Sequence, residues 1–411
     1  MSTEKSPPTK ERERVKNSCC AYFYATLKET TEDCPMIRRL KGYLFALLLA
    51  SSSFLGSIFV LYPLMPILLI WPKRWRIILD RVVGFWEILV VAYLKYISGV
   101  ECRIHGDKIS SNEKAIIIMN HRTRLDWMFF WNALSQMNPW LLTTEKIILK
   151  SDLKKIYGAS WAMQANGFIF LDRNWETDES LLRNGCKYLV ETGNTYQILL
   201  FPEGTDYCVR SRIRSQEYSS ANNLPVLTHL LQPRITGLSC VIAELLKKNS
   251  LDCIYDVTIA FPDEIVQTEI DLICKGRCPS KVDFKVKKYP IETLDFNLDM
   301  DLNEMVTDWC RKLWHRKDTI LSNYYSDDEE KRSFASKRIM ESEGVRFYPF
   351  LLIFTLLFWS IMTILWVYLV ICYFWAKMFL ISGILLFVLS DLFFGGFDAV
   401  IKKLSMTKEQ A

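Results

Sequence analysis

One histidine in the chain stands where an α/β protein would carry a catalytic base. His121 follows the apolar run Ala115–Met119 and Asn120, and Asp126 comes five residues after it. In α/β proteins the binding and catalytic side chains gather at the carboxyl ends of strands. A carboxylate on one imidazole nitrogen fixes the tautomer and leaves the other nitrogen as a base. The spacing predicts a His–Asp pair that activates a nucleophile; the alternative is a helix-capping Asp beside an exposed His.

The residues around this pair include no obvious nucleophile. Neither Ser160-Trp161 nor Ser239-Cys240 forms the Gly-x-Ser-x-Gly turn of a serine hydrolase. The base and the carboxylate of a catalytic triad are therefore present without the nucleophile, and we expect the substrate's own hydroxyl to be that nucleophile. The remaining histidines have no carboxylate at a suggestive spacing and are expected to be ordinary surface or core residues: His105, His229 and His315.

A second motif follows the apolar run that ends at Phe201. The chain there continues as Pro202-Glu203-Gly204-Thr205. Glycine permits backbone conformations that other residues avoid, and a turn of successive backbone amides can hold an anion. We expect Thr205 and the amides after it to form such a site; the alternative is an ordinary turn at the end of a strand.

Together, the two motifs carry a family resemblance. The order NHRTRLD and then FPEGT resembles the glycerolipid (PlsC-type) acyltransferase family, with Gly167–Arg173 similar to its second motif and Val257–Pro262 similar to its fourth. The stretches NHRTRLDWMFFW, WAMQANGFIFLDRNW, LLFPEGTD and LQPRITG resemble the lysocardiolipin and lysophosphatidylinositol acyltransferase branch. The resemblance covers residues 120–262, the middle of the chain.

The resemblance implies a mechanism for the predicted pair. His121 would deprotonate the free hydroxyl of the acceptor and Asp126 would orient His121, so that the alkoxide attacks the acyl-CoA thioester directly. Because like charges repel, Glu203 cannot hold a phosphate by itself and is expected to position Arg173 or a backbone turn. The residues implied in binding the acceptor, or in supporting its site, are Asn120, Arg173, Glu203, Gly204, Thr205 and Pro262.

Three further arginines are candidates for anion binding. Arg122 and Arg124 alternate within the His–Asp loop and are candidates for contact with CoA phosphates or anionic lipid; the alternative is a solvated loop. Arg234, in the stretch PRITG, is a candidate for phosphate binding. Cys274 and Cys278 are close in sequence but lack a second ligand pair with zinc spacing, so we expect no metal site and no cofactor beyond the co-substrate acyl-CoA.

Composition points to a membrane protein with a water-facing middle. The 411-residue chain is 50% hydrophobic, and the apolar excess lies in blocks near its two ends. The net charge of +5 suits an anionic surface or a phosphate-bearing substrate, and no dense basic patch with interleaved aromatic residues suggests nucleic acid. The twelve cysteines are scattered, which favours a reducing compartment.

The middle of the chain alternates short apolar runs with longer amphipathic ones. This alternation predicts an α/β domain, a mixed sheet flanked by helices, with membrane helices at both ends of the chain. The predicted strands are Ala115–Met119, Phe168–Leu171, Ile198–Phe201, Val257–Phe261 and Val282–Val286, and the predicted helices are Ser180–Glu191 and Ser239–Lys248. The predicted segments are a polar tail (1–42), an N-terminal membrane-embedded region (43–100), the acyltransferase domain (101–320), a charged linker (321–346), a transmembrane hairpin (347–400) and a second tail (401–411).

The N-terminal apolar region does not predict a simple span. The segment Tyr43–Trp71 has no charged residue and is long enough for one span, but Pro63 and Pro66 would bend a helix there. Basic residues flank both of its ends, and the positive-inside rule then favours a bent or re-entrant hairpin. Residues 82–100 contain Glu87 and Lys95, so an interfacial helix or shallow insertion is favoured over a second span.

The C-terminal region predicts a helical hairpin. Phe347–Cys372 and Met378–Phe397 are apolar, and Lys377 lies near the expected turn. Basic residues outside the pair put both ends, and with them the catalytic domain, on the cytosolic side. Acidic residues in the N-terminal tail argue against a mitochondrial-type presequence, so we expect an endoplasmic reticulum membrane protein.

The predicted function is acyl-CoA:lysophospholipid O-acyl transfer at a bilayer, with acyl-CoA, a lysophospholipid and the membrane as partners. Lysophosphatidylinositol, lysocardiolipin and lysophosphatidylglycerol are the expected acceptors. One alternative is a 1-acylglycerol-3-phosphate acyltransferase, and another is a CoA-independent phospholipid transacylase with the same His–Asp pair. A non-catalytic lipid-binding protein is a third, against which the presence of both His121 and Asp126 argues. The sequence does not indicate an oligomeric state.

Overall fold

The computed structural model describes residues 34–298, 300–329, 332–339 and 347–407. Its centre is a mixed eight-stranded sheet in the order β4-β3-β5-β2-β6-β7-β1-β8. β2 lies in the middle and pairs in parallel with both β5 and β6, whereas β6 and β7 are antiparallel. The strands are β1 (Glu101–Gly106), β2 (Ala115–Met119), β3 (Glu145–Lys150), β4 (Ile169–Leu171), β5 (Gln197–Leu200), β6 (Cys253–Ala260), β7 (Lys281–Pro290) and β8 (Arg338–Ile339).

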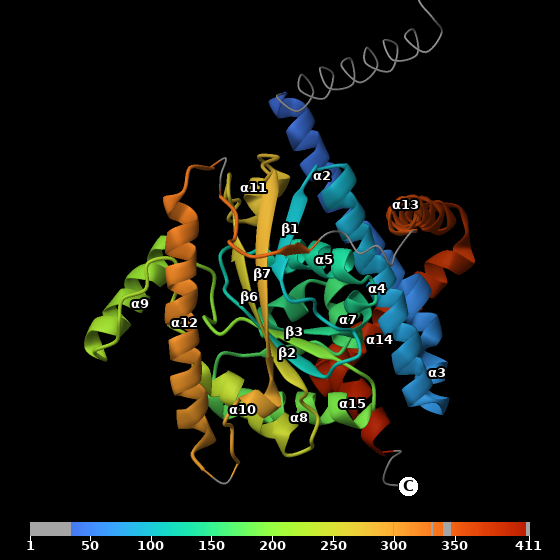
Figure 1. Ribbon diagram of the computed structural model, residues 1–411. Coiled ribbons are helices and arrows are strands. Elements are labelled where there is room, and N and C mark those ends of the chain that lie inside the picture. Colours follow the sequence, from blue (N-terminus) through green and yellow to red (C-terminus); the bar gives the residue numbers. More distant parts are fainter. Residues whose placement is uncertain (1–33, 299, 330–331, 340–346, 408–411) are drawn as a thin grey trace, which may run out of the picture.

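Helices cover both faces of this sheet (Figure 1). The α-helices are α2 (Pro35–Gly56), α3 (Met65–Ile70), α4 (Pro72–Tyr96), α5 (Asp126–Met137), α6 (Leu141–Thr144), α7 (Ala159–Ala165), α8 (Trp175–Glu191), α9 (Val209–Ala221), α10 (Ile235–Leu246), α11 (Glu269–Ile273), α12 (Leu302–Ser326), α13 (Tyr348–Cys372), α14 (Phe374–Phe394) and α15 (Phe397–Thr407). Shorter turns of helix are η1 (Ser57–Leu61), η2 (Tyr62–Leu64), η3 (Ser151–Lys155) and η4 (Ile291–Thr293).

The buried strand β2 divides the core into two layers. Its five residues are all buried, as in a parallel strand covered on both faces. Because successive side chains point to opposite faces, Ile117 and Met119 pack with α4 and α5, whereas Ile116 and Ile118 pack with α8 and α10. The predicted mixed sheet flanked by helices is confirmed.

The N-terminal membrane region differs from the prediction in where the chain reverses. Pro63 and Pro66 lie where η2 and α3 continue the rod begun by α2 and η1, and the chain turns back only at Trp71, before α4. α2 and α4 then run antiparallel, with Trp86 Nε1 donating to Ser52 Oγ at 3.0 Å. The helix type changes next to the prolines, to a π-helical turn in η1 and a 3₁₀ turn in η2, but the rod is not broken.

Residues 82–100, expected to form an interfacial helix or a shallow insertion, are helical as far as Tyr96. They belong mainly to α4, a single 25-residue helix that packs against α5, α6 and α13. Most of its second half is buried, and Glu87 accepts a hydrogen bond from Asn166 Nδ2 at 3.3 Å. Of the two charges that suggested an interface, Glu87 is enclosed by the protein and Lys95 is half-buried.

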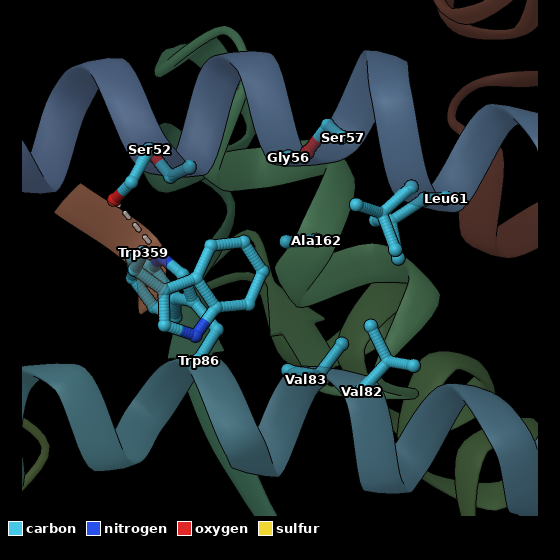
Figure 2. A pocket seen from close by; sticks show the side chains of 11 residues that line it. Ser52, Gly56, Ser57, Leu61, Val82, Val83, Trp86, Ala162 and Trp359 are labelled. Atoms are coloured by element: carbon cyan, nitrogen blue, oxygen red, sulfur yellow. Dashed lines mark hydrogen bonds between the residues drawn. The ribbon is translucent and has the colours of Figure 1, made fainter. Parts of the chain in front are cut away.

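A small cavity marks how closely the N-terminal helices pack (Figure 2). It measures about 20 Å³ and lies between α2, α4, α7 and Trp359 of α13. Ser52, Gly56 and Ser57 line one wall, and Trp86 and Trp359 close another. This space holds no more than about one water-sized group.

The C-terminal helices do not form the predicted antiparallel hairpin. Only Tyr373 separates α13 from α14, and Figure 1 shows α13 nearly end-on while α14 runs across the view. α13 packs on α2 and α4, and α14 leads to α15, which packs on α7. Residues 401–407, predicted as tail, lie in α15.

Two boundaries of the acyltransferase domain also shift. α12 continues past residue 320 to Ser326 with Leu321 and Tyr324 buried, and β8 adds an antiparallel strand to β1. Part of the segment predicted as a linker is therefore structural. Among the described residues, three helical stretches are long and apolar enough to cross a bilayer: Pro35–Ile70, Tyr348–Cys372 and Phe374–Phe394. Most of the predicted N-terminal tail, residues 1–33, lies outside the described residues.

Candidate active site

The loop between β2 and α5 brings the two predicted side chains together. His121 Nδ1 lies 3.0 Å from Asp126 Oδ2, within hydrogen-bond distance. β2 ends at Met119 and α5 begins at Asp126, so the loop must fold back within six residues. The His121 side chain is 20% exposed, whereas the Asp126 side chain is fully buried. The Nδ1 side of the imidazole thus contacts Asp126, while part of the ring stays in contact with solvent.

Asp126 is held by a local network. Thr123 donates twice, from its backbone nitrogen to Asp126 Oδ2 at 2.9 Å and from its hydroxyl to Oδ1 at 2.8 Å. The Thr123 hydroxyl also accepts from the Leu125 backbone at 3.2 Å. With three donors on a buried carboxylate, rotation of Asp126 would leave at least one of them unpaired, which is costly.

The surroundings of His121 favour its protonated form. Burial alone would lower its pKa, but the hydrogen bond that His121 donates to Asp126 and the charges of Asp126, Glu203 and Asp206 raise it above the ordinary value of 6.5. The ring lies 4.3 Å, between centroids, from the Phe201 ring. A raised pKa makes the neutral imidazole a stronger base once it has lost its proton.

Glu203 lies beneath the site and connects its loops. Its carboxylate accepts from the His121 backbone nitrogen at 3.3 Å and from the Leu231 backbone nitrogen at 3.2 Å. The residue is 2% exposed, and burial raises its pKa to about 7. Of the two roles expected for Glu203, positioning a backbone turn matches these contacts, whereas its contacts do not include Arg173.

Two arginines meet at the glycine of the second motif. Arg173 Nη2 donates to the Gly204 carbonyl at 3.3 Å. A Cβ at position 204 would lie 3.3 Å from Arg234 Cδ, and the φ of +69° already disfavours any side chain there. Arg173 and Arg234 are both exposed, and Thr205 follows directly. This arrangement provides two guanidinium groups and a turn for an anion.

The comparisons with known proteins agree with this geometry. The family profile described as Acyltransferase matches residues 101–229, and that described as Acyltransferase C-terminus matches residues 273–359. Lysocardiolipin acyltransferase 1 of Gallus gallus is 36% identical over 369 residues, which cover 88% of this chain and 93% of the relative. The chain belongs to the acyltransferase family. The resemblance inferred from its motifs is thereby confirmed, and the protein is an acyltransferase.

Two other relatives of the acyltransferase differ in the substrate that their names state. Lysophosphatidylinositol acyltransferase 10 of Caenorhabditis elegans is 38% identical over 335 residues and covers 79% of this chain and 83% of the relative. The probable 1-acyl-sn-glycerol-3-phosphate acyltransferase 5 of Arabidopsis thaliana is 30% identical over 298 residues, covering 72% of this chain and 76% of the relative.

Not every predicted site residue of the acyltransferase faces the site. The Asn120 side-chain amide bonds to the backbone of β6: its Oδ1 accepts from Ile259 N at 2.9 Å, and its Nδ2 donates to Ile259 O at 3.2 Å. Pro262 is buried, and its carbonyl accepts from Arg332 at 2.8 Å. Both residues close the sheet next to the site, and the structure gives neither a free polar group for a substrate.

The side chains of the two arginines in the His–Asp loop lie in different surroundings. The Arg122 guanidinium lies 4.4 Å from the centre of the Tyr207 ring, and its Nε and Nη1 are enclosed without a partner among the described residues. Arg124 is exposed and reaches Glu269 at 3.9 Å. Arg122 therefore packs inside the site region, whereas Arg124 points toward solvent at α11.

Sequence reasoning missed the residues that join the loops of the acyltransferase. The Tyr207 backbone nitrogen donates to the His121 carbonyl at 2.8 Å. Gln267 Nε2 reaches the carbonyl of Arg122 at 3.1 Å, Asp206 Oδ2 at 3.2 Å and the Tyr207 carbonyl at 3.3 Å. Thr123 had a local signal, a hydroxyl three residues before the Asp, but Gln267 lies 145 residues after Arg122 and no local pattern indicates its role.

The other histidines have structural contacts. His105 is buried, with Nδ1 3.1 Å from the Ser336 carbonyl, and His229 stacks on Tyr325 with ring centroids 5.1 Å apart. His315 is exposed on α12. No group of three or more His, Cys, Asp or Glu that could hold a metal ion occurs in the described part of the chain.

Proposed function

We propose that the protein is an acyl-CoA:lysophospholipid O-acyltransferase in which His121 is the general base. The observation that carries this proposal is the 3.0 Å contact between His121 Nδ1 and a buried, threefold-bonded Asp126. The contact fixes the tautomer with hydrogen on Nδ1 and leaves Nε2 to accept a proton. Among the described residues no serine, threonine or cysteine side chain is bonded to His121, so the acceptor's hydroxyl is the nucleophile.

The proposed reaction proceeds in one displacement. His121 Nε2 takes the proton of the acceptor hydroxyl while the oxygen attacks the thioester carbonyl of acyl-CoA. The carbon–sulfur bond breaks, and the CoA thiolate leaves with the proton that His121 returns. The products are a diacyl phospholipid and CoA, and no acyl-enzyme forms. Asp126 stabilises the transient imidazolium by its charge without taking the proton.

The phosphate of the lysophospholipid would bind at the Gly204 turn. Arg173 and Arg234 supply two positive charges there, and Thr205 supplies a hydroxyl. Guanidinium groups pair with phosphate oxygens through two donors at once, which fixes orientation as well as affinity. A phosphate held there would bring the glycerol hydroxyl toward His121, because Glu203 connects the two loops.

The names of the relatives guide the choice of acceptor. Lysocardiolipin and lysophosphatidylinositol are the acceptors that two relatives' names state, and both are phosphodiesters. The second candidate acceptor is 1-acylglycerol-3-phosphate, named for a plant relative at 30% identity. Two converging guanidinium groups also suit the greater charge of that phosphomonoester, and the experiment below includes it.

The proposed location is the endoplasmic reticulum membrane, with the catalytic domain facing the cytosol. Apolar helices at both ends of the chain support a membrane protein. Lys73 and Arg74 follow the N-terminal rod at the start of α4, the helix that leads into the catalytic domain, which supports a cytosolic position for that domain.

The test is CoA release by the purified protein with oleoyl-CoA and a panel of lysophospholipids that includes lysophosphatidic acid. We expect release that requires a lysolipid and falls about 10²–10⁴-fold in His121→Ala, because a positioned base typically contributes that much. His315→Ala, an exposed histidine on α12, is the matched control and should keep wild-type activity. Acyl transfer from a phospholipid without CoA would instead favour the transacylase.

A further inference from the structure

α9 is attached to the molecule in an unusual way. Its inward face is a line of serines at every fourth position: Ser211, Ser215 and Ser219. Ser215 Oγ accepts from the Gln232 backbone nitrogen at 2.8 Å, and Ser219 Oγ accepts from Gln232 Nε2 at 2.9 Å. A surface helix normally faces the core with apolar residues. α9 is therefore held by polar contacts, and burial of apolar side chains does not explain its sequence.

The exposed surface of α9 carries three arginines. Arg210, Arg212 and Arg214 are all exposed, and none of their side chains forms an ion pair or hydrogen bond with another described residue. Arg210 and Arg214 lie one turn apart on one side of the helix, whereas Arg212 points to a different side. Exposed arginines elsewhere in the domain do pair, as Arg183 does with Glu179 at 2.7 Å. The guanidinium groups of Arg210 and Arg214, one turn apart, repel each other, and an anionic ligand between them would offset that repulsion.

α9 begins next to the candidate catalytic centre. Its N-cap, Cys208, follows Tyr207, whose backbone nitrogen donates to the His121 carbonyl at 2.8 Å. An α-helix rises about 1.5 Å per residue, so the three arginines lie within the first two turns from that junction. The Gly204 turn, with Arg173 and Arg234, precedes the same helix. The pair Arg210 and Arg214 thus follows the Gly204 turn along the chain and is separate from it.

Its place in the fold decides between a membrane and a soluble ligand. Figure 1 shows α9 beyond α12, on the opposite side of the sheet from α2, α4 and α13. The apolar helices that could enter a bilayer are therefore remote from α9. An acyl-CoA carries its own anions away from the reacting thioester, since the pantetheine arm separates the thioester from a diphosphate and a 3′-phosphate.

We propose that Arg210 and Arg214 of α9 bind the 3′-phosphorylated ADP end of acyl-CoA. This inference rests on the proposed function in one respect, namely that acyl-CoA is the donor. It assigns the phosphates of the two substrates to different arginines: the acceptor's phosphate to Arg173 and Arg234, and the donor's to α9. Since the reacting atoms do not touch α9, its arginines contribute to binding of donor and transition state alike.

The test uses full-length protein in nanodiscs and the variant Arg210→Gln/Arg214→Gln. We expect the KM for oleoyl-CoA to rise about 10–100-fold, as for lost hydrogen bonds to charged groups, with kcat and the KM for lysolipid unchanged. Lys312→Gln/Arg316→Gln, two exposed cations one turn apart on the neighbouring helix α12, is the matched control and should behave as wild type.

A second comparison isolates the 3′-phosphate. In calorimetry, wild type should bind CoA more tightly than dephospho-CoA, and the α9 variant should lose that preference. The 3′-phosphate adds affinity only when the arginines that contact it are present. An unchanged KM for oleoyl-CoA, a preserved preference for CoA, or an effect seen only on anionic vesicles would overturn the proposal. Because CoA binding is read without turnover, wild type that binds CoA but fails to transfer acyl groups would contradict the proposed function and not this site.

Discussion

At the scale of single residues, the candidate base depends on how firmly its partner is held. Asp126 receives two hydrogen bonds from Thr123 and lies 3.0 Å from His121 Nδ1. All three residues belong to one loop, so the geometry of the pair needs few long-range contacts. Glu203 adds the connection to the loop that carries the proposed phosphate site.

Asp126→Asn should nearly abolish activity while keeping the volume of the side chain. The amide can offer a hydrogen to Nδ1, which turns the imidazole to the wrong tautomer and places hydrogen on the nitrogen that must act as base. We expect kcat to fall about 10²–10⁴-fold. Steady-state CoA release measures this, and a variant with more than about a tenth of wild-type kcat would contradict the assigned role.

Thr123 is expected to be a positioning residue. Thr123→Ser keeps the hydroxyl that donates to Asp126 Oδ1 and should retain activity, whereas Thr123→Val loses it and should lower kcat about tenfold, consistent with about 1–2 kcal/mol for a buried hydrogen bond. The pH–rate profile separates positioning from folding, since only a displaced carboxylate changes the pKa of His121. Equal activity of the two variants would refute the assignment.

The pH dependence follows from the direction of the His121 shift. A general base works in its neutral form, so the rate should rise with pH through a midpoint above the ordinary 6.5. Glu203→Gln removes a negative charge that raises the pKa of His121, and the midpoint should move to lower pH. Because the pKa of Glu203 is itself about 7, its charge develops over the same range. Glu217→Gln, an exposed residue of α9, is the control; a midpoint that moves upward in Glu203→Gln would contradict the sign.

At the scale of elements, close approach of helices depends on where glycines lie. A Cβ at Gly84 of α4 would lie 2.8 Å from Thr143 Cγ2 and 3.1 Å from its backbone nitrogen. At Gly56 of α2 the nearest atom is Trp359 Cζ3 at 3.5 Å, beside the cavity of Figure 2. Thr143 therefore leaves no room for a methyl group at position 84, whereas position 56 has room for one.

Gly84→Ala should therefore lower the free energy of unfolding by about 1–3 kcal/mol, the usual cost of overpacking. Gly56→Ala, its matched control, should be neutral or gain about 0.5–1 kcal/mol, because alanine is favoured over glycine inside a helix. Thermal unfolding of both variants in the same detergent makes the comparison. A Gly84→Ala protein as stable as Gly56→Ala would show that α4 and Thr143 are not packed as described.

The sequence predicted elements best where the signal was local. All five predicted strands overlap observed ones, because their apolar runs reflect burial on both faces. β1 and β3 were missed, since Arg103, His105 and Lys146 interrupt the apolar pattern with polar groups that find partners only in the folded protein. The His121–Asp126 contact follows from one loop, whereas the roles of Asn120 and Gln267 depend on strands and loops far apart in sequence.

At the scale of the whole molecule, the C-terminal helices are part of the packed structure. Trp359 of α13 is 3% exposed and its Nε1 donates to the Phe85 carbonyl of α4 at 3.3 Å. α15 returns to the domain, where Gln164 Oε1 accepts from the Phe397 backbone at 2.6 Å and Lys154 pairs with Asp398 at 2.9 Å. These contacts lie on the same side of the sheet as the N-terminal rod, so both ends of the chain support one helical assembly.

Trp359→Ala should destabilise the protein by about 3–5 kcal/mol, as for other large-to-small changes at buried aromatic residues. Trp375→Ala, at a tryptophan of α14 that is 58% exposed, removes the same group and should have little effect. Thermal unfolding in nanodiscs measures both. Equal melting temperatures for the two variants would show that α13 is only an anchor.

The central claim is that the acceptor's hydroxyl, deprotonated by His121, attacks acyl-CoA directly. Rapid mixing of wild type with oleoyl-CoA, first without and then with a lysophospholipid, measures CoA release on the time scale of one turnover. For wild type we expect no CoA release without the acceptor and immediate release with it. For His121→Ala we expect no release under either condition. A burst of CoA equal to the enzyme concentration in the absence of acceptor would reveal an acyl-enzyme and contradict direct attack.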